Sequence, residues 1–265
     1  MTRARNPRLM TVTPATLADI PRDRWPRHVA VIMDGNGRWA QARGLPRAAG
    51  HREGVATVRR VVTEAARLGL EAITLYSFSS ENWKRPADEV AALMFLCCEF
   101  LRIERETMLR ENIRFRRIGR RDGLPPEVLA ELDETERVTA AHTGLTLCLA
   151  LNYGSRTELA DAARALAADV LAGRLRPDEI DEATFASRLY TAGIPDPDLL
   201  VRTAGEMRIS NYLLWQISYA ELHVTEVLWP DFSVDDFHAA IRAFAGRERR
   251  FGGVLSQSPS LDRAH

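Results

Sequence analysis

The sequence predicts a single α/β domain whose mostly parallel central sheet is flanked by helices. Short apolar runs alternate with helical patterns along the chain, which is typical of the βαβ units that build parallel sheets. The 265 residues, 46% of them hydrophobic, are enough to bury one substantial core. No long linker and no internal repeat divides this pattern. We therefore expect one domain with helices on both faces of the sheet.

The first strand is an apolar run from Val29 to Met33 that ends abruptly at Asp34. A run without alternating polarity is typical of a strand that is buried on both faces. Five more runs are interpreted as strands. In order, the expected strands are Val29–Met33, Ala72–Ser77, Arg114–Ile118, Leu145–Leu151, Leu199–Arg202 and His223–Val227.

Helical patterns separate these runs and continue after the last one. They are Glu53–Leu68, Asp88–Glu111, Pro126–Ala141, Thr157–Ala172, Ala183–Ala192 and Val234–Arg249. The second of them departs from the usual amphipathic form, because its first half, up to Leu101, has almost no polar face. Such a helix is either a central core helix or the wall of an apolar cavity.

The two ends of the chain lack these patterns. Residues 1–27 are rich in arginine and proline and contain no apolar segment typical of a secretory signal, so we expect a flexible extension. Residues 254–265 are interpreted as a flexible tail. The folded domain is therefore expected to span residues 28–253.

The overall composition excludes some functions. Lys+Arg and Asp+Glu both number 36, so no net charge attracts the chain to nucleic acid or to a membrane. The longest apolar run, Val90 to Cys98, is too short to span a bilayer. The three cysteines, Cys97, Cys98 and Cys148, show neither a disulfide pattern nor metal-ligand spacing. A reducing cytoplasm is the simplest location.

The segment after the first strand points to an anion. Asp34 is followed by Gly35-Asn36-Gly37-Arg38, and ligands of open α/β sheets bind where strands end. Two glycines allow backbone N–H groups to approach a phosphate, Arg38 adds charge, and Asp34 suits Mg²⁺. Asp-Gly and Asn-Gly are also ordinary turn dipeptides, so the segment alone leaves both readings open.

Other polar groups lie near expected strand ends. The two glycines are followed by Arg47 and His51, the second strand by residues 79–86, and the fifth strand by residues 202–211. Glu221 precedes the sixth strand. Each of these taken singly has an ordinary structural explanation.

Taken together, the groups predict a site for a phosphate-bearing substrate with a metal ion. Five arginines would converge on one sheet edge: Arg38, Arg47, Arg85, Arg202 and Arg208. One unpaired like-charge contact at 4 Å costs ~4 kcal/mol at an effective dielectric constant of 20, so such a cluster requires anions. Asp34 and Glu221 could share a divalent cation.

Eight segments in one order closely resemble the cis-prenyltransferases, the isoprenyl transferase family of undecaprenyl diphosphate synthase. They are Asp-Gly-Asn-Gly-Arg-Trp-Ala (34–40), Arg-Ala-x-Gly-His (47–51), Phe-Ser-Ser-Glu-Asn-Trp-x-Arg-Pro (78–86), Asn-Tyr-Gly (152–154), Arg-Thr-x-Gly-Glu-x-Arg-Ile-Ser-Asn (202–211), Leu-Leu-Trp-Gln (213–216), Tyr-Ala-Glu-Leu (219–222) and Trp-Pro-Asp-Phe (229–232). The resemblance covers residues 28–253. It implies Mg²⁺-dependent condensation of isopentenyl diphosphate onto an allylic prenyl diphosphate, with cis double bonds formed.

The resemblance also implies roles for single residues. Asp34 would bind Mg²⁺ beside the allylic diphosphate, and Glu221 would be a second metal ligand. The substrate-binding positions would be Gly35, Asn36, Gly37, Arg38, Trp39, Arg47, His51, Ser79, Ser80, Glu81, Trp83 and Arg85, with Arg202, Arg208, Ile209 and Ser210 at the isopentenyl diphosphate. Arg250 matches an element that reaches the partner subunit's site, which implies a homodimer.

The resemblance places proton acceptance at Asn82. An amide is a very weak base, so we expect Asn82 to orient a proton relay to a diphosphate oxygen instead. The apolar helix would be one wall of a product tunnel, with Ser77 and Leu145 as candidate floor positions. Peripheral contact with a membrane is compatible with release of a lipid product.

Two residues of the isopentenyl diphosphate segment depart from the common pattern of the family. Ala204 stands where glycine is frequent, and Met207 where histidine or glutamine is frequent. A long-chain product for cell-wall synthesis is the main expectation. The alternatives are a short-chain, farnesyl-type or irregular synthase and a non-catalytic subunit that binds lipid diphosphates. A trans-type enzyme is disfavoured because no Asp-Asp-x-x-Asp occurs, and a nucleotide-binding module because no phosphate-loop glycine pattern occurs.

Overall fold

The computed structural model describes residues 13–247 and has six strands in one sheet. The strands are β1 (His28–Ile32), β2 (Ala72–Ser79), β3 (Arg114–Ile118), β4 (Thr146–Tyr153), β5 (Leu199–Arg202) and β6 (Glu221–Val224). Their order across the sheet is β3-β4-β2-β1-β5-β6, and all neighbouring pairs are parallel. The predicted fold class is confirmed. The expected bounds of the last strand, His223–Val227, were wrong, because β6 begins at Glu221 and ends at Val224.

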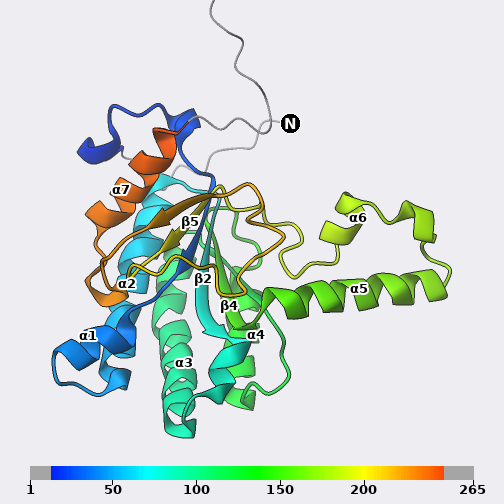
Figure 1. The fold of residues 1–265 in the computed structure, drawn as a ribbon, viewed down its shortest axis with the longest axis horizontal. Helices are drawn as coiled ribbons and strands as arrows, with labels where there is room; N and C mark the ends of the chain where they lie inside the picture. The colour runs from blue at the N-terminus through cyan, green and yellow to red at the C-terminus, as the bar shows by residue number, and fades with distance from the viewer. Residues whose placement is uncertain (1–12, 248–265) are drawn as a thin grey trace, which may run out of the picture.

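Four helices cover one face of the sheet: α2 (Arg47–Leu68), α3 (Ala87–Arg110), α4 (Pro126–Thr139) and α7 (Val234–Ala245) (Figure 1). Val29 and Val31 of β1 pack against this layer, whereas Ala30 and Ile32 face the other side. That side is covered by the irregular segment 209–217 and not by a second helical layer. The expectation of helices on both faces is corrected accordingly.

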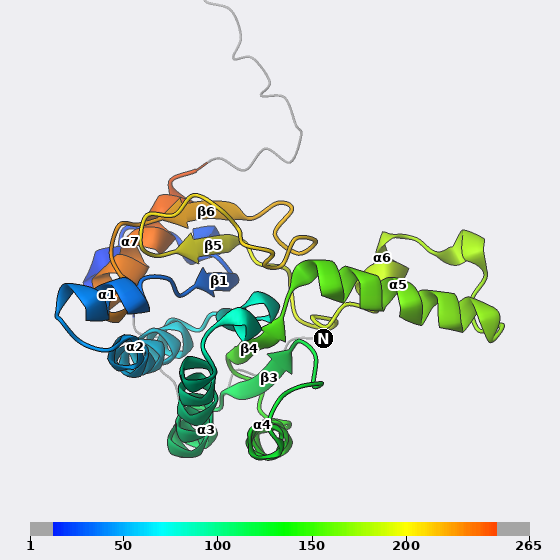
Figure 2. The same cartoon turned by 60° about the horizontal axis from the view of Figure 1, so that its bottom comes forward.

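A helical arm projects from the sheet (Figures 1 and 2). It contains α5 (Ser155–Leu171) and α6 (Glu182–Ala186). The expected helix over 183–192 is therefore much shorter than predicted, since turns follow Ala186. The first two turns of α5 are tied to the body: buried Glu158 accepts hydrogen bonds from Tyr153 and Gln216, and Asp161 accepts from Arg120.

Two parts of the N-terminal region differ from expectation. Residues 13–27 contain two short 3-10 helices, Ala15–Leu17 and Arg22–Arg24, and Leu17 is fully buried against the main core. This segment thus belongs to the packed body, which starts before residue 28. The segment after β1, expected as a loop, forms helix α1 (Asn36–Ala42). Among residues 13–247, no helix is both long enough and apolar enough to cross a bilayer.

Candidate active site

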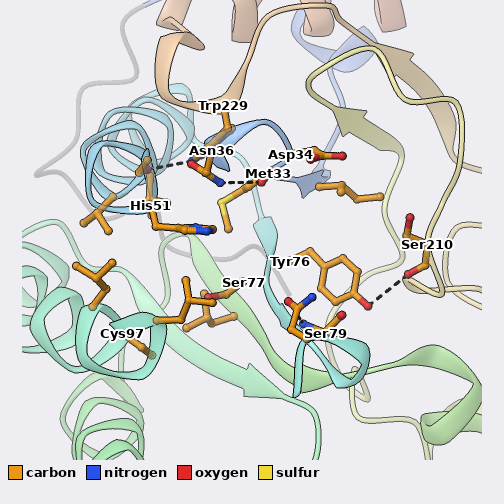
Figure 3. A pocket seen from close by; sticks show the side chains of 18 of the residues that line it. Met33, Asp34, Asn36, His51, Tyr76, Ser77, Ser79, Cys97, Ser210 and Trp229 are labelled. Atoms are coloured by element: carbon orange, nitrogen blue, oxygen red, sulfur yellow. Dashed lines mark hydrogen bonds between the residues drawn. The ribbon is translucent and has the colours of Figure 1, made fainter. Parts of the chain in front are cut away.

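A cavity of about 620 Å³ opens at the carboxyl ends of β1, β2 and β5 and continues between α2 and α3 (Figure 3). One part of its lining is polar: Asp34, Asn36, His51, Ser79, Glu81, Asn82, Arg85, Arg202, Arg208, Ser210 and Asn211. Another part is apolar: Val55, Val58, Leu93, Leu96, Cys97, Phe100 and Leu149. Ser210 and Cys97 lie at opposite sides of the view in Figure 3. An ionic head group and an apolar tail could therefore bind together.

Asp34 lies just beyond the end of β1. Its Oδ1 accepts a 2.7 Å hydrogen bond from the backbone N–H of Gly35, and its backbone N–H and carbonyl both bond Thr203 Oγ1. Its Oδ2 accepts from Arg202 Nη2 at 2.8 Å. These contacts fix the carboxylate at the mouth of the cavity.

Arg202 is the last residue of β5 and is only 5% exposed. Besides Asp34, it donates through Nη1 to Ser210 Oγ at 2.8 Å and to the carbonyl of Arg208. Its Nε is buried and finds no hydrogen-bond partner among residues 13–247. A buried guanidinium with a spare donor beside a cavity suits an anionic ligand, because a buried unpaired donor is costly.

The predicted glycine segment caps a helix. Gly35 has a φ of 105°, which favours glycine, and its carbonyl accepts the first helical hydrogen bond from Trp39. The N–H groups of Asn36, Gly37 and Arg38 begin α1 and have no earlier helical carbonyl to bond. A Cβ on Gly37 would lie 2.6 Å from Nη1 of Arg47, so a larger residue here would displace that guanidinium. Backbone donors and a cation therefore meet at this point.

His51 and Arg85 lie on the polar rim of the cavity. Burial, with the positive charges of Arg85 and Arg47, lowers the pKa of His51 from 6.5 to about 4, although Glu89 opposes this shift. His51 is thus neutral near pH 7. A bound diphosphate would raise its pKa, since an opposite charge favours the protonated ring.

The segment after β2 forms a short 3-10 helix, Ser80–Lys84. Asn82 and Ser79 form a capping box in which Asn82 Oδ1 accepts from the Ser79 N–H at 3.1 Å. The side-chain oxygen of Asn82 therefore already accepts a hydrogen bond, and its side-chain NH₂ group remains free to donate to a ligand. Glu81 accepts a 2.9 Å hydrogen bond from Asn211, which links this segment to the one after β5.

Glu81 is kept ionised. Burial raises its pKa, but hydrogen bonds from Asn211, the backbone and the neighbouring serines outweigh burial and hold the pKa below 4.5. Ser80 donates to Glu81 at 3.3 Å and does not line the cavity. The ionised Glu81 carboxylate thus holds Asn211 and Ser80 in place at the rim of the cavity.

Ser210 and Arg208 line the cavity, but Ile209 between them packs into the core on the far face of the sheet. Arg38 lies within 3.7 Å of Asp34 and 3.6 Å of Glu206, and Arg208 also contacts Glu206. All five predicted arginines therefore lie near the carboxyl edge of the sheet. Met207 is 81% exposed.

Several predicted residues are not brought to the cavity. The indole N–H of Trp39 donates to Asp231 at 2.7 Å, and Arg43 stacks on its ring. Trp83 packs edge-on against Phe78 and donates to Asn152. Neither tryptophan lines the cavity. Arg250 lies outside the described residues.

The expected pairing of Asp34 with Glu221 is wrong within one chain. Glu221 pairs in register with Leu199, and Leu199 pairs with Val29, five residues before Asp34. Glu221 therefore lies level with the start of β1, whereas Asp34 follows its end; at about 3.3 Å per residue, the strand from Val29 to Ile32 alone spans about 10 Å. Glu221 instead forms an ion pair of 2.6 Å with Arg247.

Of the two structural readings of the apolar helix, the structure shows the wall of an apolar cavity, since α3 supplies Leu93, Leu96, Cys97 and Phe100 to the lining. Ser77 also lines the cavity, next to an irregularity of the β2–β4 register. Leu145 does not line the cavity. Leu149 of β4, four residues later, lines it instead. The three cysteines are free and buried.

Some lining residues had not been singled out. Tyr76 stacks on Tyr212 at 4.3 Å and its hydroxyl donates to the carbonyl of Ser210 at 3.4 Å. Val55 and Val58 of α2 form the wall opposite α3. The valines lie three residues apart on a helix, a spacing that signals one apolar face but not a cavity.

The donor set at Asp34 is compatible with a magnesium ion. Mg²⁺ is usually held by one or two carboxylates together with substrate phosphates and water. Within residues 13–247, no three histidine, cysteine or carboxylate side chains cluster as a metal site of their own. A single carboxylate beside several arginines suits a Mg²⁺ ion that binds together with a diphosphate.

Comparisons with known proteins agree with this geometry. The family model described as "Putative undecaprenyl diphosphate synthase" matches residues 32–252. The chain is 56% identical over 229 residues to an isoprenyl transferase of Rhizobium meliloti, covering 86% of this chain and 93% of the relative. It is 57% identical over 229 residues to an isoprenyl transferase of Rhodopirellula baltica, covering 86% and 94%.

Solved structures show the same fold. Lavandulyl diphosphate synthase from Lavandula x intermedia, in complex with dimethylallyl diphosphate, superposes with a TM-score of 0.85 at 38% identity, covering 87% of this chain and 99% of that chain. A "probable undecaprenyl diphosphate synthase" from Campylobacter jejuni gives a TM-score of 0.71 at 32% identity, covering 86% and 98%. The chain therefore belongs to the isoprenyl transferase family of undecaprenyl diphosphate synthase and is a prenyltransferase.

Proposed function

We propose that this prenyltransferase condenses isopentenyl diphosphate head-to-tail onto an allylic prenyl diphosphate, with Mg²⁺, to give a cis-polyprenyl diphosphate. The observation that carries the proposal is the continuity of a cationic rim with an apolar cavity. The rim suits diphosphates, and the cavity suits a growing hydrocarbon chain. No smaller polar substrate would use both parts.

The basic residues of the rim form two groups, which supports two diphosphates. Arg47, His51 and Arg85 lie beside the start of α2 and α3, whereas Arg202 and Arg208 follow β5. We assign the first group, with the start of α1, to the allylic diphosphate. We assign the second group, with Ser210, to isopentenyl diphosphate.

The reaction breaks the allylic C–O bond, and the leaving diphosphate gains negative charge. Arginines stabilise that charge most strongly in the transition state, which is how they accelerate the step. The alkene of isopentenyl diphosphate then attacks the allylic carbocation, and a proton leaves C2. The Asn82 amide, with its oxygen bonded to Ser79, orients the diphosphate oxygen that accepts this proton.

Magnesium belongs to the allylic diphosphate in this proposal. Asp34 would hold the ion together with phosphate oxygens, and the ion would supply charge stabilisation to the leaving group. Glu221 is not included as a ligand, because it lies at the other end of the strands. The ion pair with Arg202 keeps Asp34 oriented toward the cavity.

The main proposed product is a long-chain lipid-carrier precursor for cell-wall synthesis. At ~0.8 kcal/mol per buried CH₂, each five-carbon unit adds ~4 kcal/mol of binding, which retains the growing chain. Both isoprenyl transferase relatives are more similar in sequence than the lavender enzyme. The second candidate is a short-chain or irregular synthase, favoured by the TM-score of 0.85 to lavandulyl diphosphate synthase.

We also propose a cytoplasmic homodimer. The C-terminal Arg250-Phe251-Gly252 would complete the partner's site, and a peripheral membrane contact would allow the lipid product to leave. Sedimentation of the purified chain tests the dimer. A monomer that elongates normally would contradict the role of Arg250.

One incubation tests the proposed reaction. The purified chain is given isopentenyl diphosphate, Mg²⁺ and allylic primers of one, two or three isoprene units, and products are sized by mass spectrometry. A ladder of cis-polyprenyl diphosphates supports long-chain synthesis. A single product of two or three units selects the second candidate, and no condensation with any primer refutes the proposal.

A further inference from the structure

Glu89, in the first turn of α3, is the point at which two arginine side chains and one histidine side chain of the rim converge. Arg85 Nη1 lies 2.8 Å from its Oε1, Arg47 Nε lies 3.3 Å from its Oε2, and His51 Nε2 lies 3.7 Å from its Oε1. The three side chains come from α2 and from the turn before α3. Glu89 is 12% exposed at its side chain and does not line the cavity, whereas His51 and Arg85 do.

An ordinary surface ion pair does not explain this arrangement. A helical i,i+4 pair such as Arg85–Glu89 contributes only ~0.3–0.5 kcal/mol and needs one partner. Here one largely buried carboxylate contacts cations from two segments. Without it, neighbouring like charges at 4 Å would repel by ~4 kcal/mol at an effective dielectric constant of 20. The rim loses a diphosphate each time a product leaves, so this repulsion would recur in every cycle.

We propose that Glu89 is a positioning residue that holds Arg47, His51 and Arg85 in the geometry required by the allylic diphosphate. The inference rests on the proposed function. Glu89 acts from behind the rim, so it orients the cations and does not occupy the place of the phosphates. Among the described residues, Glu89 forms no ion pair with Arg202 or Arg208. The carboxylate partners of those two arginines are Asp34 and Glu206. Glu89 therefore acts on one of the two diphosphates.

The test compares Glu89→Gln with Asp88→Asn. Both changes remove one negative charge from the first turn of α3 and keep the side-chain shape. Within the described chain, Asp88 makes no ion pair or hydrogen bond, so its variant controls for the effect of charge on the helix N-terminus. We expect Glu89→Gln to raise KM for the allylic primer at least tenfold, with KM for isopentenyl diphosphate within twofold. Asp88→Asn should leave both constants within twofold.

A second readout does not depend on turnover. Ring signals of isotope-labelled histidine, assigned through His51→Gln, report the binding of inorganic pyrophosphate with Mg²⁺ beside His51. Glu89→Gln should require at least tenfold more pyrophosphate for half-saturation than the unmodified chain and Asp88→Asn. Equal saturation in all three proteins overturns the role of Glu89. Tighter binding in Glu89→Gln also overturns it, because Glu89 would then compete with phosphate for the cations.

The two proposals fail in different ways. If the unmodified chain forms no product, the proposed reaction is refuted, and the pyrophosphate titration still decides the role of Glu89. If product forms normally but Glu89→Gln changes neither KM nor pyrophosphate binding, only the positioning role is refuted. Glu89→Asp keeps the charge with a shorter side chain, and we expect it to restore at least part of the lost affinity.

Discussion

Arg202 and Asp34 form a 2.8 Å ion pair that joins the carboxyl ends of two neighbouring parallel strands, β5 and β1. Arg202 belongs to the group assigned to isopentenyl diphosphate, and Asp34 belongs to the proposed metal and allylic site. In the proposed reaction, the pair would therefore set the spacing between the two substrates. Arg202 also keeps the Asp34 carboxylate paired, in the orientation in which it would bind a metal ion.

We predict that Arg202→Lys raises KM for isopentenyl diphosphate roughly tenfold or more. Lysine keeps the positive charge but lacks the planar fork that bonds Asp34 and Ser210 together. Loss of one charge-assisted hydrogen bond costs about 1.5–3 kcal/mol, which is at least tenfold in affinity. Steady-state kinetics with each substrate varied in turn measure the effect. A rise confined to the allylic KM would contradict the assignment of Arg202.

Asp34→Asn should abolish the stimulation of turnover by Mg²⁺, with kcat lowered by roughly 10²–10³, a loss typical of removing one group that stabilises transition-state charge. Asparagine keeps the shape and can still accept from the Gly35 N–H. Binding of pyrophosphate without metal should be unchanged or tighter, because a negative charge is removed from the site. Calorimetric titration with and without Mg²⁺ measures both. Full Mg²⁺ stimulation in the variant would exclude Asp34 as the ligand.

Asn82→Ala should lower kcat while KM for either diphosphate changes little, because the amide is proposed to orient the proton acceptor. The substitution also removes one half of the capping box with Ser79. Ser79→Ala removes the other half and leaves the Asn82 amide in place. Because Ser79 also lines the cavity, only a loss of kcat with unchanged KM for both diphosphates is attributed to the cap. Turnover of Asn82→Ala equal to that of the unmodified chain would remove Asn82 from the mechanism. Equal losses in both variants would assign it to the cap.

Two of the strands could be predicted because a parallel sheet buried on both faces needs uninterrupted apolar runs, and residues 29–33 and 199–201 are such runs. Helix α1 could not be predicted from the sequence, because Gly35-Asn36-Gly37 has the local propensity of a turn. Its helix is fixed by tertiary contacts: a Cβ on Gly50 would lie 2.0 Å from the carbonyl oxygen of Asn36. Only glycine allows α1 and α2 to approach so closely.

The cationic rim was predictable because charged residues follow strand ends, and parallel strands end at one edge. The same rule shows why Glu221 was misplaced. A chain that leaves β5 must return to the amino edge before entering a parallel neighbour, so a residue at the start of β6 lies far from Arg202. Trp39 and Trp83 were also misplaced relative to the cavity, because a sequence does not show which way an indole turns. Their partners, Asp231 and Asn152, are distant in sequence.

Acidification should destabilise the fold through His28, which is 1% exposed and bonded to the Pro195 carbonyl and Thr74 Oγ1. Burial lowers the pKa of His28 from 6.5 to about 4. Between these pH values the unfolded chain binds the proton more readily than the folded one. The stabilisation is complete above pH 6.5 and is lost as the pH falls toward 4.

Between pH 7 and pH 5 this histidine should account for a loss of about 2 kcal/mol in the free energy of unfolding. Urea denaturation at both pH values measures the loss. His28→Gln starts from lower stability but lacks the titrating ring. Its free energy of unfolding should therefore decrease by about 2 kcal/mol less than that of the unmodified chain between pH 7 and pH 5. His51, whose pKa is shifted in the same direction, remains in both proteins. Identical decreases in the two proteins would contradict the role of His28.

Leu149→Ala and Leu145→Ala form a matched pair that tests whether the cavity sets the product length. Both leucines are 4% exposed, and Leu→Ala in a core costs about 2–5 kcal/mol. Only Leu149 lines the cavity. Leu149→Ala should therefore lengthen the main product by at least one five-carbon unit, whereas Leu145→Ala should lower stability without changing it. Mass spectrometry of the products and thermal unfolding of both variants measure these effects. Equal lengthening by the two variants would mean that loosening of the core, rather than room in the cavity, governs chain length.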